Sequence, residues 1–166
     1  EYSDFIVIGE PEQVINNIKN KEIPKGLVKS EPIKDLDTLP YPDWSIFPIE
    51  KFSYNPIISK KPFTFILSSR GCPYTCSYCP YKLFGLYRSR DPIKVVDEIE
   101  YLQKKYKIKG LMFRDPMFSL NPEKTRILAE EIIKRKIRIE WGCETRLDKL
   151  DKSLLDILYN SGLRAI

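Results

Sequence analysis

The sequence predicts an α/β protein with a parallel sheet, and three observations carry this prediction. From residue 63 onward, short apolar runs alternate with segments of helical periodicity, which is typical of βαβ units. Two of the helical segments open with a capping residue followed by proline. Over 166 residues, a content of 42% hydrophobic and 31% charged side chains is that of a globular protein of about one domain.

The N-terminal third is organised differently. Tyr2 to Gly9 predicts a short buried strand, and a helix is expected to start near Pro11. Residues 20–61 have the composition of a linker, because repeated prolines exclude a long helix or a central strand. Large aromatic side chains usually anchor such a connector, so three of them are expected to pack on the outside of the following domain: Tyr41, Trp44 and Phe47.

The remaining segment predicts strand, loop and helix in repetition. Strands are expected at Phe63–Leu67, Gly110–Phe113, Ile137–Trp141 and Leu163–Ile166. Helices are expected to begin after Asp91, Asn121 and Asp151, with the first ending near Tyr106 and the last at Gly162. Ligands of parallel α/β folds bind at the carboxyl ends of the strands, so groups that follow these strands should share one edge.

The first of these strands leads into three closely spaced cysteines, Cys72, Cys76 and Cys79, in the pattern C-x3-C-x2-C. Three thiols so near one another cannot all form disulfides with each other, but they can converge on one metal centre. Zinc in a closed site and an iron–sulfur cluster are the two options. The chain has no histidine, so any chemistry must use cysteine, carboxylates, arginine and a cofactor.

With an aromatic residue, Tyr78, before the third cysteine, this loop resembles the signature of the radical S-adenosylmethionine (radical SAM) enzymes. The resemblance implies that the three cysteines hold a [4Fe-4S] cluster, whose remaining iron binds S-adenosylmethionine. The cluster would then cleave this ligand reductively to a 5′-deoxyadenosyl radical. It also implies contacts to S-adenosylmethionine from residues on the same edge of the sheet: Tyr78, Asp115, Glu144 and Arg146.

Two further motifs resemble the cobalamin-binding subclass of that superfamily. They are G-E-x-E at residues 9–12 and L-D-x-L-P-x-P at residues 36–42. The resemblance implies the end of a Rossmann-like cobalamin domain (1–19), an inter-domain linker (20–61) and the first half of a (β/α)6 partial TIM-like barrel (62–166). We therefore expect a fragment that is inactive alone. The whole enzyme is expected to perform cobalamin-dependent methylation or a related radical reaction on a small-molecule or natural-product-type substrate, with flavodoxin or ferredoxin as electron donor.

Other interpretations of the same residues stay open. Cys143 either provides a fourth ligand, which would make a closed electron-transfer cluster, or is a small buried side chain. A zinc-stabilised binding module is the third class. Asp115 could only cap a turn, Glu144 and Arg146 could pair with each other, and Arg70 and Arg88 could either balance a cluster's charge or lie on the surface.

Composition also constrains location and partners. The net charge of +5 is spread over segments that also carry acids, which favours a solvated surface over a nucleic-acid-binding patch. No apolar run approaches the roughly 20 residues that a membrane span requires. Clustered free thiols suit a reducing compartment, so a cytoplasmic location is expected.

Overall fold

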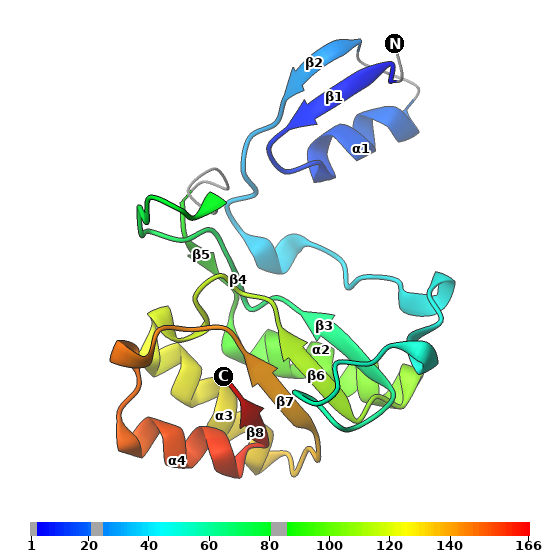
Figure 1. Ribbon diagram of the computed structural model, residues 1–166. Coiled ribbons are helices and arrows are strands. Elements are labelled where there is room, and N and C mark those ends of the chain that lie inside the picture. Colours follow the sequence, from blue (N-terminus) through cyan, green and yellow to red (C-terminus); the bar gives the residue numbers. More distant parts are fainter. Residues whose placement is uncertain (1–2, 21–24, 81–85) are drawn as a thin grey trace.

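The computed structural model describes residues 3–20, 25–80 and 86–166. Figure 1 shows a small N-terminal unit above a larger sheet with helices on one face, and an extended segment that passes between them. Both units contain parallel strands, so the predicted α/β class is confirmed. Among the described residues, no helix is both long and apolar enough to cross a membrane.

The larger sheet has four strands in the order β3-β6-β7-β8, and every neighbouring pair is parallel. The strands are β3 (Phe63–Ile66), β6 (Gly110–Phe113), β7 (Glu140–Cys143) and β8 (Leu163–Ala165). Spatial order therefore follows sequence order, with each strand beside the next one along the chain. Of the predicted half-barrel, the structure shows this sheet of four parallel strands.

The helices between these strands start where the sequence predicts. They are α2 (Pro92–Tyr106), α3 (Pro122–Lys134) and α4 (Lys152–Asn160). The side chains of Asp91, Asn121 and Asp151 each accept a hydrogen bond from the first turn of their helix. The chain leaves α4 at Gly162, whose φ of 112° and closeness to the Ile139 carbonyl leave no room for a β-carbon.

One strand was misplaced in the sequence analysis. The predicted strand Ile137–Trp141 starts three residues later, as β7, because the backbone N–H of Ile137 still bonds to the Ile132 carbonyl at the end of α3. Lys136, with φ of 57°, makes the turn out of the helix. Cys143 is consequently the last residue of β7, whereas the sequence analysis placed it after the strand.

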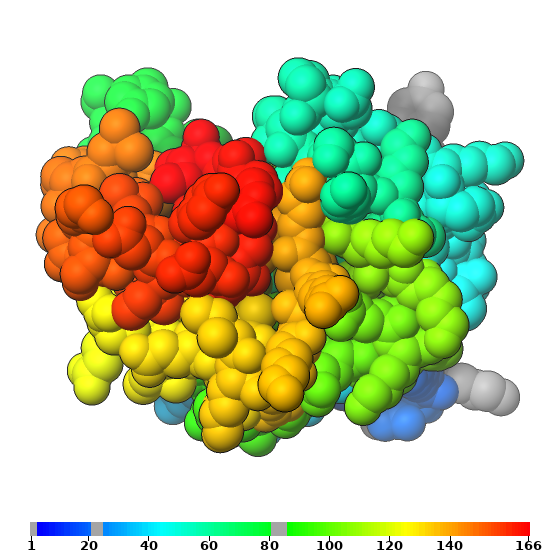
Figure 2. Space-filling model, turned by 90° about the horizontal axis from the view of Figure 1, so that it is seen from below, coloured from blue at the N-terminus to red at the C-terminus, as the bar shows by residue number. Residues whose placement is uncertain are grey.

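The main core lies between the sheet and its helices. Val95, Val96 and Ile99 of α2 have no exposed surface, and the rings of Phe113, Phe118 and Trp141 pack against one another with centroid separations of 4.6–5.4 Å. Figure 2 shows α3 (yellow) and α4 (orange to red) side by side over this part of the molecule. The opposite face of the sheet carries a smaller apolar cluster of buried side chains: Ile58, Phe63 and Met112.

The N-terminal unit contains one strand that the sequence analysis did not predict. It consists of β1 (Phe5–Ile8), α1 (Glu12–Lys19) and β2 (Gly26–Lys29), with the two strands parallel. Since β2 lies inside the segment interpreted as linker, the unit extends past the predicted boundary at residue 19. The predicted strand start, Tyr2, lies outside the described residues. The strand is only half-buried, since Ile6 and Ile8 are exposed.

The segment after β2 follows the larger unit in three short turns of 3₁₀-helix, at Leu36–Thr38, Trp44–Ile46 and Ile49–Lys51. Tyr41 and Trp44 pack on the larger unit as expected, whereas Phe47 contacts only its own segment among the ring pairs of the described residues. Tyr41 meets the ring of Tyr101 on α2 at 5.3 Å, and Trp44 is partly buried against the main core. Phe47 is half-exposed and contacts the ring of Trp44 at 5.8 Å.

A short antiparallel ladder, also absent from the sequence prediction, lies where the cysteine segment leaves and rejoins the larger unit. Strand β4 (Ser69–Arg70) pairs with β5 (Arg88–Ser89), so that Arg70 faces Arg88. We call residues 71–80, which follow β4, the cysteine loop. The ladder holds the segment that precedes the cysteine loop, Ser69–Arg70, beside the segment Arg88–Ser89, where the chain rejoins the larger unit.

Candidate metal centre

The carboxyl edge of the larger sheet gathers the residues that the sequence analysis singled out. The cysteine loop follows β3 and β4, Arg114 and Asp115 follow β6, and Glu144 and Arg146 follow β7. The parallel pairing of these strands places all of them on one edge. The N-terminal unit lies over the same edge (Figure 1).

The three cysteines of the loop are free and partly exposed. The backbone N–H of Cys79 donates to the carbonyl of Cys76 at 3.1 Å, which forms a turn between the last two thiols. Within residues 3–20, 25–80 and 86–166, no three side chains of the metal-binding types lie close enough together to hold one ion. The donor set itself, three thiols on one short and accessible loop, fits a thiolate-bound cluster.

Asp115 is hydrogen-bonded to the segment that precedes this loop and is completely buried. Its carboxylate accepts hydrogen bonds from the Ser68 N–H (3.1 Å) and from the hydroxyls of Ser68 (2.9 Å) and Ser69 (2.5 Å). Burial raises the pKa of Asp115, and the hydrogen bonds from both serines oppose that rise. The carboxyl group is therefore not presented to a ligand at the edge, and its contacts instead fix the segment that enters the cysteine loop.

One interpretation of the sequence paired Glu144 with Arg146, but the structure gives these two side chains different partners. Glu144 forms an ion pair with Arg114, which follows the neighbouring strand, and both side chains are about two-fifths exposed. The backbone carbonyl of Glu144 accepts from the Phe118 N–H at 3.1 Å, which holds the end of β7 against the turn after β6. Glu144 is thus an accessible carboxylate on the edge, with one cation beside it.

Arg146 lies against the cysteine loop. Its guanidinium is 4.8 Å from the ring centroid of Tyr74, and Nε donates to Asp148 at 2.9 Å. Hydrogen bonding to Asp148 raises the pKa of Arg146, with smaller contributions from Tyr74 and Cys76. A residue at the end of the third strand of the sheet therefore contacts the loop that follows the first, which the sequence analysis expected of the shared edge.

Tyr78 and Cys143 occupy opposite environments. The Tyr78 side chain is 89% exposed, and it is available to a ligand at the edge. Cys143 is 1% exposed and packs in the main core, where burial raises the pKa of its thiol to about 12. A thiol in this state behaves as a small apolar side chain, which favours the second of the two sequence-based interpretations of Cys143.

Sequence reasoning gave no role to several residues around the site. Two of them could have been found from their positions in the sequence, because Tyr74 lies inside the cysteine motif and Arg114 directly precedes Asp115. Arg90 donates to the Leu67 carbonyl (3.0 Å) and to the buried carboxylate of Glu98 (2.5 Å), and nothing local in the sequence indicates this pairing.

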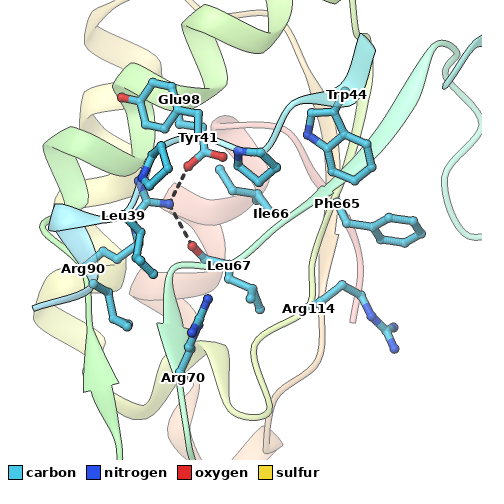
Figure 3. A pocket seen from close by; sticks show the side chains of 13 residues that line it. Leu39, Tyr41, Trp44, Phe65, Ile66, Leu67, Arg70, Arg90, Glu98 and Arg114 are labelled. Carbon is cyan, nitrogen blue, oxygen red and sulfur yellow. Dashed lines mark hydrogen bonds and ion pairs between the residues drawn. The ribbon is translucent and has the colours of Figure 1, made fainter. Parts of the chain in front are cut away.

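A cavity of about 350 Å³ lies between the end of β3 and the extended segment that carries Tyr41 and Trp44. Figure 3 shows Arg90 among the lining residues, with dashed lines to Glu98 and to the Leu67 carbonyl. Two further cations, Arg70 and Arg114, line the same cavity. The cavity therefore combines apolar walls with arginines that are each paired with a carboxylate.

Fold and site together define an α/β protein with a cysteine-rich loop at the carboxyl edge of a parallel sheet. Residues 66–166 match the Radical SAM superfamily. The chain therefore belongs to the radical SAM superfamily.

The chain is 35% identical to the anaerobic magnesium-protoporphyrin IX monomethyl ester cyclase of Rubrivivax gelatinosus, over 96% of this chain and 33% of that protein. It is 26% identical to an uncharacterized methyltransferase of Pyrococcus horikoshii, over 100% of this chain and 36% of that protein. It thus spans about a third of the length of these relatives.

The similar solved structures include those of a radical SAM methyltransferase. The radical S-adenosylmethionine methyltransferase TsrM from Kitasatospora setae, with cobalamin and a [4Fe-4S] cluster bound, has a TM-score of 0.56 and 26% sequence identity. The similarity covers 61% of this chain and 21% of TsrM. The same neighbour has also been solved with tryptophan as substrate and an analogue of S-adenosylmethionine.

Proposed function

We propose that Cys72, Cys76 and Cys79 hold a [4Fe-4S] cluster that leaves one iron for S-adenosylmethionine. The observation that carries this proposal is the position of the C-x3-C-x2-C loop at the carboxyl edge of a parallel sheet, in a chain of the radical SAM superfamily. Three protein ligands on a four-iron cluster leave an open coordination position, which is what a substrate-binding metal site requires. A reducing compartment such as the cytoplasm suits these thiols.

The edge residues have separate tasks in this proposal. Tyr78 is exposed beside Cys79 and offers its ring to the adenine, while the accessible Glu144 carboxylate accepts from the amino or ribose groups of S-adenosylmethionine. Arg146 suits the ligand's carboxylate because its guanidinium offers paired donors. Arg114 orients Glu144 by pairing with it. Asp115 supports the site through Ser68 and Ser69.

When bound, the cluster would supply one electron for the reductive cleavage of S-adenosylmethionine to methionine and a 5′-deoxyadenosyl radical, with flavodoxin or ferredoxin as the electron source. The protein's own task is orientation and the exclusion of water. The apolar side chains that line the cavity beside β3 give this part of the chain a partly desolvated surface. We expect turnover to need more of the enzyme than this chain.

The reaction of the whole enzyme is proposed to be cobalamin-dependent methylation or a related radical transformation of a small molecule. Relatives named as a cyclase and as a methyltransferase support this range, as does a solved neighbour that holds cobalamin. The G-E-x-E and L-D-x-L-P-x-P segments of the N-terminal unit and linker point to the same subclass. Because the chain spans about a third of these relatives, cobalamin would be held mainly by protein outside it.

Anaerobic reconstitution with iron and sulfide tests the proposal. We expect about four irons per chain and an EPR spectrum of the reduced protein that changes when S-adenosylmethionine is added. Cys76→Ala should abolish the cluster, and Cys143→Ala should leave it intact. A spectrum that ignores S-adenosylmethionine, together with loss of the cluster in Cys143→Ala, would instead establish a closed electron-transfer site. One tightly bound zinc would contradict the radical chemistry altogether.

A further inference from the structure

Glu10, the residue after the first glycine of the N-terminal unit, makes contacts with three other segments of the chain. Its Oε2 accepts from the backbone N–H of Ile33 at 2.8 Å and from Nη1 of Arg88 at 3.0 Å. Its Oε1 accepts from Nη2 of Arg88 at 2.6 Å, so the arginine is bound by both carboxylate oxygens. Nη1 of Arg70 lies 3.4 Å from Oε2.

The two arginines flank the cysteine loop. Arg70 immediately precedes it, Arg88 lies on the strand that pairs with β4, and the two residues are register partners in that ladder. Arg70 also pairs with Glu12 at 2.6 Å, and Nη1 of Arg88 donates to the Ile33 carbonyl at 2.5 Å. We call the set Glu10, Glu12, Ile33, Arg70 and Arg88 the Glu10 junction. Its arginines are therefore committed to carboxylates of the N-terminal unit.

The Glu10 junction is not an ordinary exposed ion pair. The side chains of Glu10 and Arg88 are only 16% and 13% exposed, so water screens their interaction weakly. Burial alone would raise the pKa of Glu10, but the hydrogen bonds from Arg88 and Ile33, with the charge of Arg70, hold it below its ordinary value. Removing one partner would leave the others partly buried and unpaired, which is costly.

We propose that Glu10 is a positioning residue that couples the N-terminal unit to the cysteine loop. It binds both stems of the loop at once, from a unit that lies over the same edge of the sheet. A displacement of β1, α1 and β2 therefore changes the position and mobility of the loop. By linkage, whatever orders the loop also holds the N-terminal unit in place. This coupling rests on the described residues alone; its consequence for a bound cluster rests on the proposed function.

Thiol reactivity of the metal-free, reduced protein tests the coupling without any cofactor. Rates of alkylation by iodoacetamide are measured for each cysteine by peptide mass spectrometry, in wild type, Glu10→Gln and Arg88→Gln. We expect the three loop cysteines to react about three- to tenfold faster in either variant, because a bidentate, charge-assisted contact is lost. The matched control is Glu31→Gln, which makes the same chemical change at an exposed residue of the segment after β2.

Two internal comparisons make the result decisive. Cys143, buried in the main core, should react no faster in the variants, since the coupling is local. The double variant Glu10→Gln/Arg88→Gln should accelerate the loop cysteines by less than the product of the two single effects, because both substitutions remove the Glu10–Arg88 contact. Loop rates equal to wild type would overturn the proposal. So would equal acceleration of the loop cysteines and Cys143, because that result indicates general loosening of the fold.

A second measurement applies when the cluster is loaded. The reduction potential and EPR spectrum of reconstituted Glu10→Gln should differ from those of reconstituted Glu31→Gln, because the stems of the loop are no longer fixed. If wild type takes up no cluster, the proposed function fails while the thiol measurement still decides the coupling. If both variants give identical potentials and spectra, the junction does not position the loop around the cluster.

Discussion

Two regions of this protein are stabilised in different ways. In the main core, four side chains have no exposed surface and contact mainly apolar neighbours: Val95, Val96, Ile99 and Trp141. At the carboxyl edge, the entry to the cysteine loop is fixed by charged and polar groups, with Glu10 on one side and Asp115 on the other. Apolar packing depends on area and tolerates small shifts, whereas hydrogen-bonded charges specify a position. The core therefore provides stability, and the edge provides placement.

The largest expected effect comes from truncating the core. In Trp141→Ala, the loss of a fully buried ring that packs on Phe113 and Phe118 should lower the free energy of unfolding by about 3–5 kcal/mol. The indole also donates to the Ser161 carbonyl at 3.1 Å, so its removal leaves a buried acceptor. Urea denaturation measures the change. Ile127→Ala, at an exposed site on α3, is the control and should cost much less.

Asp115→Asn tests whether a polar anchor at the edge also carries stability. At pH of about 4 the variant should lose at most about 1 kcal/mol, because its amide oxygen can still accept from the Ser68 N–H while its nitrogen donates to a serine hydroxyl, as a protonated carboxyl does. Burial raises the pKa of Asp115 above its ordinary value of 3.8, so the folded wild type retains a proton that the unfolded chain has lost. Wild-type stability should therefore fall, relative to the variant, as pH rises above 3.8. A difference that is constant between pH 4 and 7 would contradict this.

Cys143→Ala distinguishes core from edge at a single thiol. Because Cys143 packs as a small apolar residue, its truncation should cost about 1 kcal/mol and leave the reactivity of the three loop cysteines unchanged. Denaturation and iodoacetamide labelling on the same sample provide both values. If the loop thiols changed their reactivity strongly, Cys143 would belong functionally to the edge.

The smallest effect on stability is expected from Arg146→Gln, because the side chain is half-exposed and its ion pair with Asp148 is screened by water. Its denaturation midpoint should match that of wild type. Under the proposed function, the affinity of the reconstituted protein for S-adenosylmethionine should fall about tenfold, since charge-assisted hydrogen bonds are lost. Lys152→Gln, which removes a similar exposed cation on α4, is the matched control. Equal affinities would exclude Arg146 from the ligand site.

Elements whose signals are local in the sequence were predicted well. The starts of α2, α3 and α4 follow from a capping side chain that bonds within its own first turn. The strand Gly110–Phe113 was predicted to the residue, because a short apolar run follows a helix and precedes polar residues. The predicted start of β7 was wrong, because the Ile137 N–H still bonds to the Ile132 carbonyl at the end of α3. That bond depends on how the helix terminates, which the apolar pattern does not encode.

Contacts between distant segments could not be predicted in this way. The strands β2, β4 and β5 are short segments that carry no strong strand pattern, so neither the pairing of β2 with β1 nor that of β4 with β5 was predicted. The same holds for the Glu10 junction, in which the acid and the arginine are 78 residues apart. Asp115 was expected to face a ligand, but the structure turns it inward to Ser68 and Ser69. Charged side chains reach many partners, and only the folded geometry selects among them.

The sequence by itself determined the α/β class, the alternation of strands and helices, and the loop that carries Cys72, Cys76 and Cys79. Each of these features is determined by residues close together in the sequence, through their periodicity, helix capping or spacing. Tertiary structure alone decided that Cys143 is buried in the core, that Arg146 contacts Tyr74, and that Glu10 ties the N-terminal unit to the loop. These features depend on contacts between residues that are far apart in the chain. Such contacts form, and stabilise the protein, only when the chain has folded.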